Sequence, residues 1–264
     1  MRTKRLEPLH LVFAALGGLV LLFIVAPLVG MLLASSPGEL AETARDPEVE
    51  RSVWLTLATS MGATLILAVA AVPFAYLLAR KKFPLRQLVN GLVDLPIVIP
   101  HSAAGIALLG ILSRGTFIGE LGERAGIRFV GGHAGIMAAM AFVSVPFLVN
   151  AARDGFAAVP ERLEKAALNL GASPLRVFFT IAVPMAWRSI LSGLILMWAR
   201  GMSEFGAVLV VAYHPIITPV LIYERFGAFG LRYARPISII FIGICLLFFI
   251  VLRLVAGRRY HAEG

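Results

Sequence analysis

Four ionisable residues lie inside long apolar stretches of the sequence: Asp94, His101, Arg200 and Glu204. An ionisable group in an apolar segment is costly, so each is a candidate for binding or ion-handling chemistry. Arg200 and Glu204 are four residues apart, which places two side chains on one face of a helix. They can neutralise each other, or Arg200 can contact an anion while Glu204 serves as its resting counter-ion.

Two prolines, Pro96 and Pro100, interrupt the apolar stretch that contains Asp94 and His101. Proline removes a helix hydrogen bond and frees a carbonyl of the preceding turn, so the sequence predicts an interrupted helix here. We expect Asp94 to reach back toward the polar end of this helix. His101 is interpreted as a hydrogen-bonded packing residue rather than a metal ligand.

Residues that could support catalysis form no recognisable set. The five His residues are isolated, with no H-E-x-x-H sequence, and no Ser stands in a nucleophile-elbow context. The single cysteine, Cys245, excludes a disulfide framework and a cysteine-based metal site. The sequence also lacks G-x-x-x-x-G-K-[ST], so it has no P-loop. We predict no enzyme, no metal and no cofactor bound by this chain itself.

The composition requires a solvent other than water around these residues. The chain is 59% hydrophobic and 15% charged, with a mean hydropathy of +0.88. Soluble domains carry about 25% charged residues, so lipid is the expected surrounding. The net charge is +9, but the basic residues stand in short loops without interleaved aromatics. That pattern indicates membrane topology rather than nucleic-acid binding.

Six apolar stretches are long enough to cross a bilayer as helices. The sequence therefore predicts an all-α polytopic membrane protein, a single domain over 1–264, in a cell membrane. The expected spans are residues 9–34, 53–79, 88–112, 134–152, 189–213 and 236–256.

The basic residues predict that both termini lie in the cytoplasm. Lys and Arg are more frequent in the segments that this orientation places inside, and Arg80-Lys81-Lys82 is the clearest cluster. The first apolar run is longer than the core of a signal peptide, which favours an uncleaved span over a cleaved leader. Outside, 35–52 is expected to form a short surface helix, and 214–235 to dip back toward the membrane.

The cytoplasmic segment 153–188 is too polar to span and is patterned as helix, tight turn, helix. Gly171 is a natural helix stop, and Ser173 followed by Pro174 reads as an N-cap and first helical position. Ala172 and Ser173 are then at the tip. Pro160 is expected to open the first helix, whose apolar face consists of Leu163, Ala166, Ala167 and Leu170.

This segment resembles the EAA loop of ABC importer permeases. The family pattern is E-A-A, three residues, Gly, nine residues, then Ile-x-Leu-Pro. Two positions depart from it: Lys165 stands for the usual Glu, and Val183 for Leu, so Glu164 is expected to take the acidic role. The matching residues are Ala166, Ala167, Gly171, Ile181 and Pro184.

The resemblance implies a type I ABC importer permease fold and a loop that docks on a separate ATP-hydrolysing subunit. It also implies a homodimer, a periplasmic or lipid-anchored binding protein, and alternating access. An ordinary amphipathic helix on the membrane surface is the alternative. The expected coupling residues are Glu164, Lys165, Ala166, Ala167, Gly171, Ala172, Ser173 and Pro174.

Two further stretches, 94–108 and 198–208, are similar to molybdate and tungstate permeases, especially the archaeal type. The resemblance implies import of an oxyanion. Sulfate permeases share R-x-x-x-E-F-G-A, so a sulfate or thiosulfate permease is the alternative. Candidates for the pathway or its gate are Asp94, His101, Arg200, Ser203, Glu204 and Gly206.

A rival from another class is an ion-coupled secondary transporter, with Asp94 and Glu204 as ion sites. Such a protein would need neither the EAA-like loop nor an ATPase partner. The sequence shows no internal repeat, whereas many secondary transporters have duplicated halves. A membrane enzyme is disfavoured by the missing catalytic set.

Overall fold

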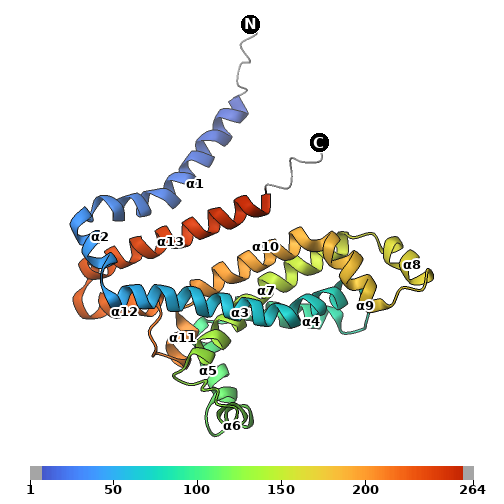
Figure 1. Cartoon of the computed structure of the whole chain (residues 1–264). Coiled ribbons are helices and arrows are strands. Elements are labelled where there is room, and N and C mark those ends of the chain that lie inside the picture. Colours follow the sequence, from blue (N-terminus) through green and yellow to red (C-terminus); the bar gives the residue numbers. More distant parts are fainter. Residues whose placement is uncertain (1–7, 258–264) are drawn as a thin grey trace.

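The computed structural model describes residues 8–257, so both ends of the predicted 1–264 domain lie outside the described part. Within that part all regular elements are helices (Figure 1). In chain order they are α1 (Pro8–Leu33), α2 (Pro37–Ala44), α3 (Pro47–Arg80), α4 (Arg86–Val98), α5 (His101–Leu112), α6 (Phe117–Arg124), α7 (His133–Ala158), α8 (Glu161–Asn169), α9 (Pro174–Val177), a π-helical turn (Phe178–Ala182), α10 (Val183–Met202), α11 (Gly206–Val211), α12 (Thr218–Phe229) and α13 (Leu231–Gly257).

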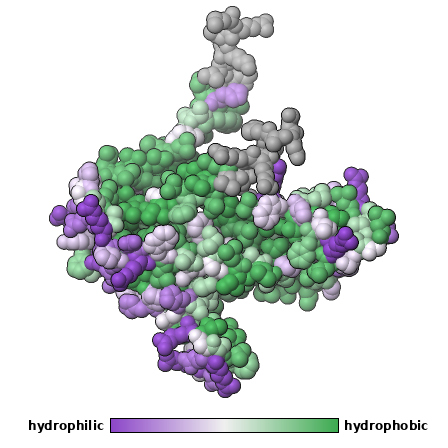
Figure 2. All heavy atoms as spheres, viewed as in Figure 1, coloured by the Kyte–Doolittle hydropathy of each residue, from purple (hydrophilic) through white to green (hydrophobic). Residues whose placement is uncertain are grey.

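Five helical runs in the described residues are long and apolar enough to cross a membrane, and the bent pair α4–α5 allows a sixth. Apolar residues cover the middle of the visible face, whereas polar residues gather over α2 and α12 at one end and α8 at the other (Figure 2). The chain is therefore a multi-pass membrane protein. The five runs are α1, α3, α7, Pro174–Met202 and α13.

Four predicted spans coincide with single helices: α1, α3, α7 and α13. The helices α3, α7 and α13 extend several residues beyond the predicted ranges. Asp46 caps α3, its side chain accepting a hydrogen bond from Glu48 N at 2.9 Å, so this helix begins well before its apolar part. The expected surface helix in 35–52 is α2, which a capping box from Ser36 and Glu39 starts.

The third predicted span is broken, because the chain bends by 113° between α4 and α5. The break falls at Ile99 and Pro100, which are both extended. Proline disfavours the helical conformation of the residue before it and offers no N–H, which explains the position of the break. Pro96 stays inside α4, so only Pro100 ends a helix.

The fifth predicted span, 189–213, is wrong as a single helix. The long helical run begins at Pro174 and ends at Met202, and α11 follows as a separate short helix. The Glu204 carboxylate accepts a hydrogen bond from Ala207 N at 2.9 Å, which caps α11 and stabilises the break. Hydropathy could not reveal this, because apolar residues continue on both sides.

The helix α7 lies between α3 and α10 at the centre of the bundle (Figure 1). Small residues permit this packing. A Cβ on Gly155 would lie 2.4 Å from Ser189 Cβ, and one on Gly193 would lie 3.0 Å from Ala151 Cβ. The helices α7 and α10 therefore pack closely against each other.

Candidate functional site

The loop after α7 folds as predicted, with helix, turn and helix. Pro160 is the N-cap residue rather than the first helical residue, so α8 begins at Glu161. Gly171 has a φ of +87°, a conformation that side chains disfavour, and it ends the first helix. Ser173 Oγ accepts a hydrogen bond from Arg176 N at 3.3 Å and so caps α9. The second helix continues through the π-helical turn directly into α10.

The apolar face of this loop has no partner among the described residues of the chain. Leu170, next to the tip, is 89% exposed, and Leu163 is also exposed. Leu175 and Phe179 add exposed apolar area on the second helix. An exposed apolar patch of this kind, rimmed by charged residues, is typical of a protein interaction site.

Glu164, which is expected to take the acidic role of the loop, faces the bundle rather than the exposed apolar face. Its carboxylate accepts hydrogen bonds from Tyr76 Oη at 2.7 Å and from the Arg80 guanidinium at 2.6 and 3.0 Å. The helix periodicity turns position 164 toward the bundle and position 165 toward solvent. Lys165 Nζ instead donates to Glu161 at 2.8 Å, and this bond lowers the pKa of the Glu161 carboxyl.

A second cluster lies at the break between α10 and α11, where His101, Arg200 and Glu204 meet. The Glu204 carboxylate is 2.9 Å from the Arg200 guanidinium and 2.8 Å from His101 Nδ1. The expected pair of Arg200 and Glu204 is therefore present, with Arg200 in the last turn of α10. Ser203 Oγ accepts a hydrogen bond from Arg200 at 3.2 Å.

Burial within this cluster is uneven. The Glu204 side chain is 1% exposed, Arg200 is 23% exposed and His101 is 42% exposed. The Arg200 guanidinium is thus partly exposed and able to contact an anion. The Glu204 carboxylate is buried, and both of its oxygens have partners. The predicted hydrogen-bonded role of His101 is confirmed, and the described residues form no group that could hold a metal ion.

Glycines bring the two broken helices together at this cluster. A Cβ on Gly206 would lie 2.8 Å from His101 Cβ. A Cβ on Gly105 would lie 2.8 Å from Val210 Cβ and 3.0 Å from the Ala207 carbonyl oxygen. The helices α5 and α11 therefore pack at backbone distance, which places His101 beside Glu204.

Asp94 lies apart from this cluster and does not simply extend to the polar end of α4. Its carboxylate accepts a hydrogen bond from Asn150 Nδ2 of α7 at 2.6 Å. Sequence reasoning had no signal for Asn150. It also treated Arg80 as a marker of topology and missed Tyr76, because nothing in the order of residues shows that Glu164 turns inward.

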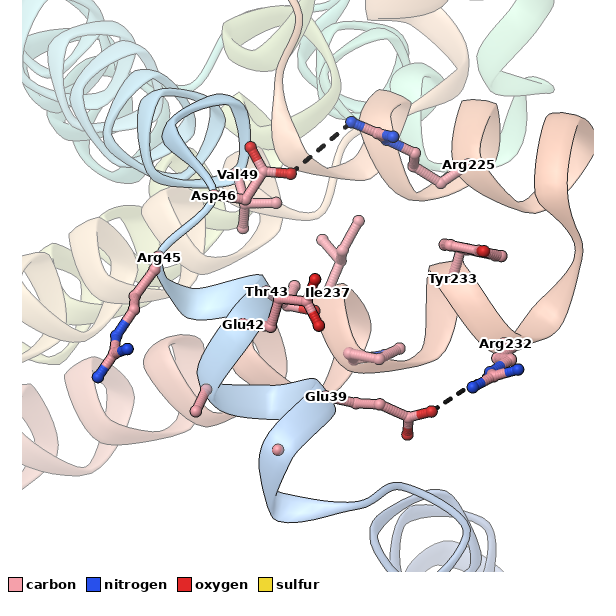
Figure 3. A pocket seen from close by; sticks show the side chains of 13 residues that line it. Glu39, Glu42, Thr43, Arg45, Asp46, Val49, Arg225, Arg232, Tyr233 and Ile237 are labelled. Atoms are coloured by element: carbon pink, nitrogen blue, oxygen red, sulfur yellow. Dashed lines mark hydrogen bonds and ion pairs between the residues drawn. The ribbon is translucent and has the colours of Figure 1, made fainter.

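The opposite end of the molecule holds a pocket of about 920 Å³ between α2, α12 and α13 (Figure 3). Arg232 donates to Glu39 at 3.3 Å, and Arg225 pairs with Asp46 and Glu48. Hydrogen bonding to the backbone of Ser36, aided by Arg232, lowers the pKa of Glu39. The charges of Arg225 and Arg232 are therefore neutralised by carboxylates in the pocket wall. The pocket is thus no simple anion site.

Residues 71–260 match the family model of binding-protein-dependent transport system inner membrane components. The chain belongs to this family. The prediction of a transport subunit rather than an enzyme is confirmed.

The chain is more similar to molybdate/tungstate permeases than to sulfate permeases. The chain is 45% identical to the molybdate/tungstate transport system permease protein of Thermococcus kodakarensis, over 94% of this chain and 96% of the relative. It is 29% identical to the sulfate transport system permease protein of a Synechocystis species, over 91% and 87%.

Among solved structures, a bacterial ABC transporter involved in alginate import matches with a TM-score of 0.72 at 16% identity, covering 95% of this chain and 96% of that one. The methionine ABC transporter MetNI matches with a TM-score of 0.60 at 14% identity, covering 82% and 96%. At these identities the likeness establishes the fold alone.

Proposed function

We propose that this chain is the permease subunit of an ATP-driven importer that carries molybdate or tungstate into the cell. The observation that carries the proposal is the loop at α8 and α9, which presents an exposed apolar tip and is continuous with α10. A permease without a P-loop needs a handle of this kind for a separate motor. The molybdate/tungstate relatives, which are more similar than the sulfate relative, support the choice of oxyanion.

In this proposal six spans cross the cell membrane and both termini lie in the cytoplasm. The bent pair α4–α5 supplies the sixth span beside the five long helices. The cluster Arg80-Lys81-Lys82 then lies inside, next to α8. The pocket between α2, α12 and α13 faces outside, where a binding protein would deliver its oxyanion (Figure 3).

We propose three protein partners for this chain. An ABC ATPase subunit grips the loop 153–188 within the predicted coupling residues from Glu164 to Pro174 and binds ATP and Mg²⁺ itself. A periplasmic or lipid-anchored binding protein meets the outer loops. A second copy of the chain completes a two-fold pathway, and this chain binds no cofactor of its own.

We place the pathway or its gate at the break between α10 and α11. Arg200 would contact the passing oxyanion through its open side, with Glu204 as the counter-ion between passages. Gly206 and Ser203 flank this point and keep the backbone close. Asp94 stays a weaker candidate, because it is bonded to Asn150.

Two alternatives remain for testing. A sulfate or thiosulfate permease would share the Arg200–Glu204 pair and differ only in cargo. An ion-coupled secondary transporter would use Glu204 or Asp94 as an ion site and would work without a motor. Both carboxylates already have protein partners, which gives this second alternative little support.

The test is uptake by proteoliposomes that contain the complete complex with its ATPase and binding protein. We expect ATP-dependent uptake of labelled molybdate, with tungstate a better competitor than sulfate. Inactivation of the P-loop lysine of the ATPase should abolish uptake. Uptake that persists without ATP hydrolysis would favour the secondary transporter, and sulfate as the better competitor would favour the sulfate permease.

A further inference from the structure

The residues around Glu164 join four helical segments at the root of the loop. Arg80, the last residue of α3, donates to Glu164 at 2.6 Å and to the Val159 carbonyl oxygen, at the end of α7, at 3.0 Å. Tyr76, one turn earlier on α3, donates to the same carboxylate at 2.7 Å. The Tyr76 ring also meets Phe178 edge-on, with centroids 5.0 Å apart.

This cluster is enclosed and fully bonded. The side chains of Arg80 and Glu164 are 9% and 8% exposed, respectively. Charged hydrogen bonds to one carboxylate from a guanidinium and a phenol fix its position more firmly than a single surface pair can. Removal of either charge leaves the other buried without compensation.

The connection matters because the loop is covalently joined to α7 before α8 and to α10 after α9, but not to α3. Its second helix runs through the π-helical turn into α10, so movement passes to α10 along the chain itself. The helix α3 packs against α7 and α10 but has no covalent continuity with the loop. The bonds from Arg80 and Tyr76 to Glu164 tie the loop directly to α3.

We propose that Tyr76, Arg80 and Glu164 form a strut that transmits movement of the loop to α3. Glu164 is thus a positioning residue that faces inward, while Lys165 and the apolar tip face the motor. This proposal rests on the proposed function, since the movement comes from the ATPase. Without the strut, α10 would move while α3 lagged behind, and ATP would be hydrolysed with little import.

The test compares two carboxylates on one helix in the complete complex. Glu164→Gln removes the strut's charge, and Glu161→Gln removes a carboxylate that pairs with Lys165 at 2.8 Å in solvent. For Glu164→Gln we expect the molybdate imported per ATP hydrolysed to fall about tenfold, a typical size for coupling between distant sites. Glu161→Gln should keep the unaltered ratio, and an unaltered ratio in Glu164→Gln would overturn the strut.

Two further readouts separate transmission from simple misfolding. Arg80→Gln combined with Glu164→Gln should lower the ratio no more than the worse single variant, because both act on one connection. Fully additive losses would contradict the strut. If the Glu164→Gln chain no longer binds the ATPase, Tyr76→Phe replaces it as the test, since it removes one hydroxyl only. A lowered ratio of molybdate imported to ATP hydrolysed in Tyr76→Phe supports the strut, and an unaltered ratio overturns it.

Spin labels at the exposed positions Arg162 and Lys82 test the strut independently of transport. Their distance distribution should be narrow in the unaltered complex and broad in Glu164→Gln. An equally narrow distribution in both would overturn the strut. If the unaltered complex fails to import molybdate, the proposed function fails, and this label measurement still decides on the strut.

Discussion

The pair Arg80–Glu164 and the pair Arg200–Glu204 have the same chemistry but opposite surroundings. At the root of the loop both partners are enclosed, and Tyr76 adds a further donor. At the helix break Glu204 is buried, but Arg200 is partly open and His101 is half exposed. An ion pair whose two partners are both buried can hold elements in place, whereas a pair with a partly exposed cation can also exchange its partner.

Arg80→Gln should cause the largest loss of stability. It leaves the Glu164 carboxylate buried without a cation, which costs about 3 kcal/mol in the free energy of unfolding. Thermal unfolding of the purified chain in detergent measures this loss. Arg153→Gln, which removes a pair with the exposed carboxylate of Asp154, is the control and should change little. A melting temperature of Arg80→Gln equal to that of the unaltered chain would show that the Arg80–Glu164 pair is not shielded from solvent.

Gly105→Ala should cause the next largest effect, because the added methyl meets Val210 Cβ and the Ala207 backbone. Backbone cannot yield as a flexible side chain can, so overpacking should cost about 2 kcal/mol. Gly110→Ala is the matched control on α5, where a Cβ meets nothing within 4 Å. Equal melting temperatures for the two variants would refute close packing of α5 on α11.

Arg200→Gln should cost less than Arg80→Gln, about 1 kcal/mol, because hydrogen bonds to a charged group survive at Glu204. Its carboxylate still meets His101 and the Ala207 amide. Uptake of molybdate should nevertheless fall if Arg200 contacts the cargo. Unchanged uptake and unchanged substrate dependence, at equal expression, would remove Arg200 from the pathway and make both pairs structural.

The smallest effect is expected at the outer pocket, where the Glu39 side chain is partly exposed. Its pKa lies below the ordinary value of 4.5, chiefly through the hydrogen bond from the Ser36 backbone. Its contribution to stability is therefore present above the unfolded pKa and is lost as the pH falls through the lowered folded pKa. Melting temperatures of Glu39→Gln and the unaltered chain should converge in acid. Glu42→Gln, on the same exposed helix, serves as the control, and a gap that widens in acid would contradict the assignment.

Much of the helical layout was predictable, because a bilayer demands long apolar runs and the loop carries strong Gly and Pro signals. The break at Pro100 followed from the covalent chemistry of proline. The break after Met202 could not be predicted, because it depends on Glu204 capping α11. In the sequence, a capping carboxylate inside an apolar run cannot be told from any other buried charge. The pair of Arg200 and Glu204 was predictable from its spacing alone.

Side-chain contacts between segments far apart in the chain could not be predicted from the sequence. Glu164 meets Arg80 across 84 positions, and Asn150 meets Asp94 across 56. Spacing rules describe one helix at a time, so they gave no sign that Glu164 turns inward to Arg80 and Tyr76. The outer pocket, made by α2, α12 and α13, was likewise beyond reach.

In the proposed function, a motor in the cytoplasm grips the tip of the loop at Ala172. The most direct measurement is cross-linking from a cysteine at Ala172, in a chain whose native Cys245 is replaced by Ser, within the complete complex in membrane vesicles. We expect a cross-link to the ATPase subunit whose yield changes when ATP is added. No cross-link to the ATPase, together with labelling of this cysteine from outside the cell, would contradict it.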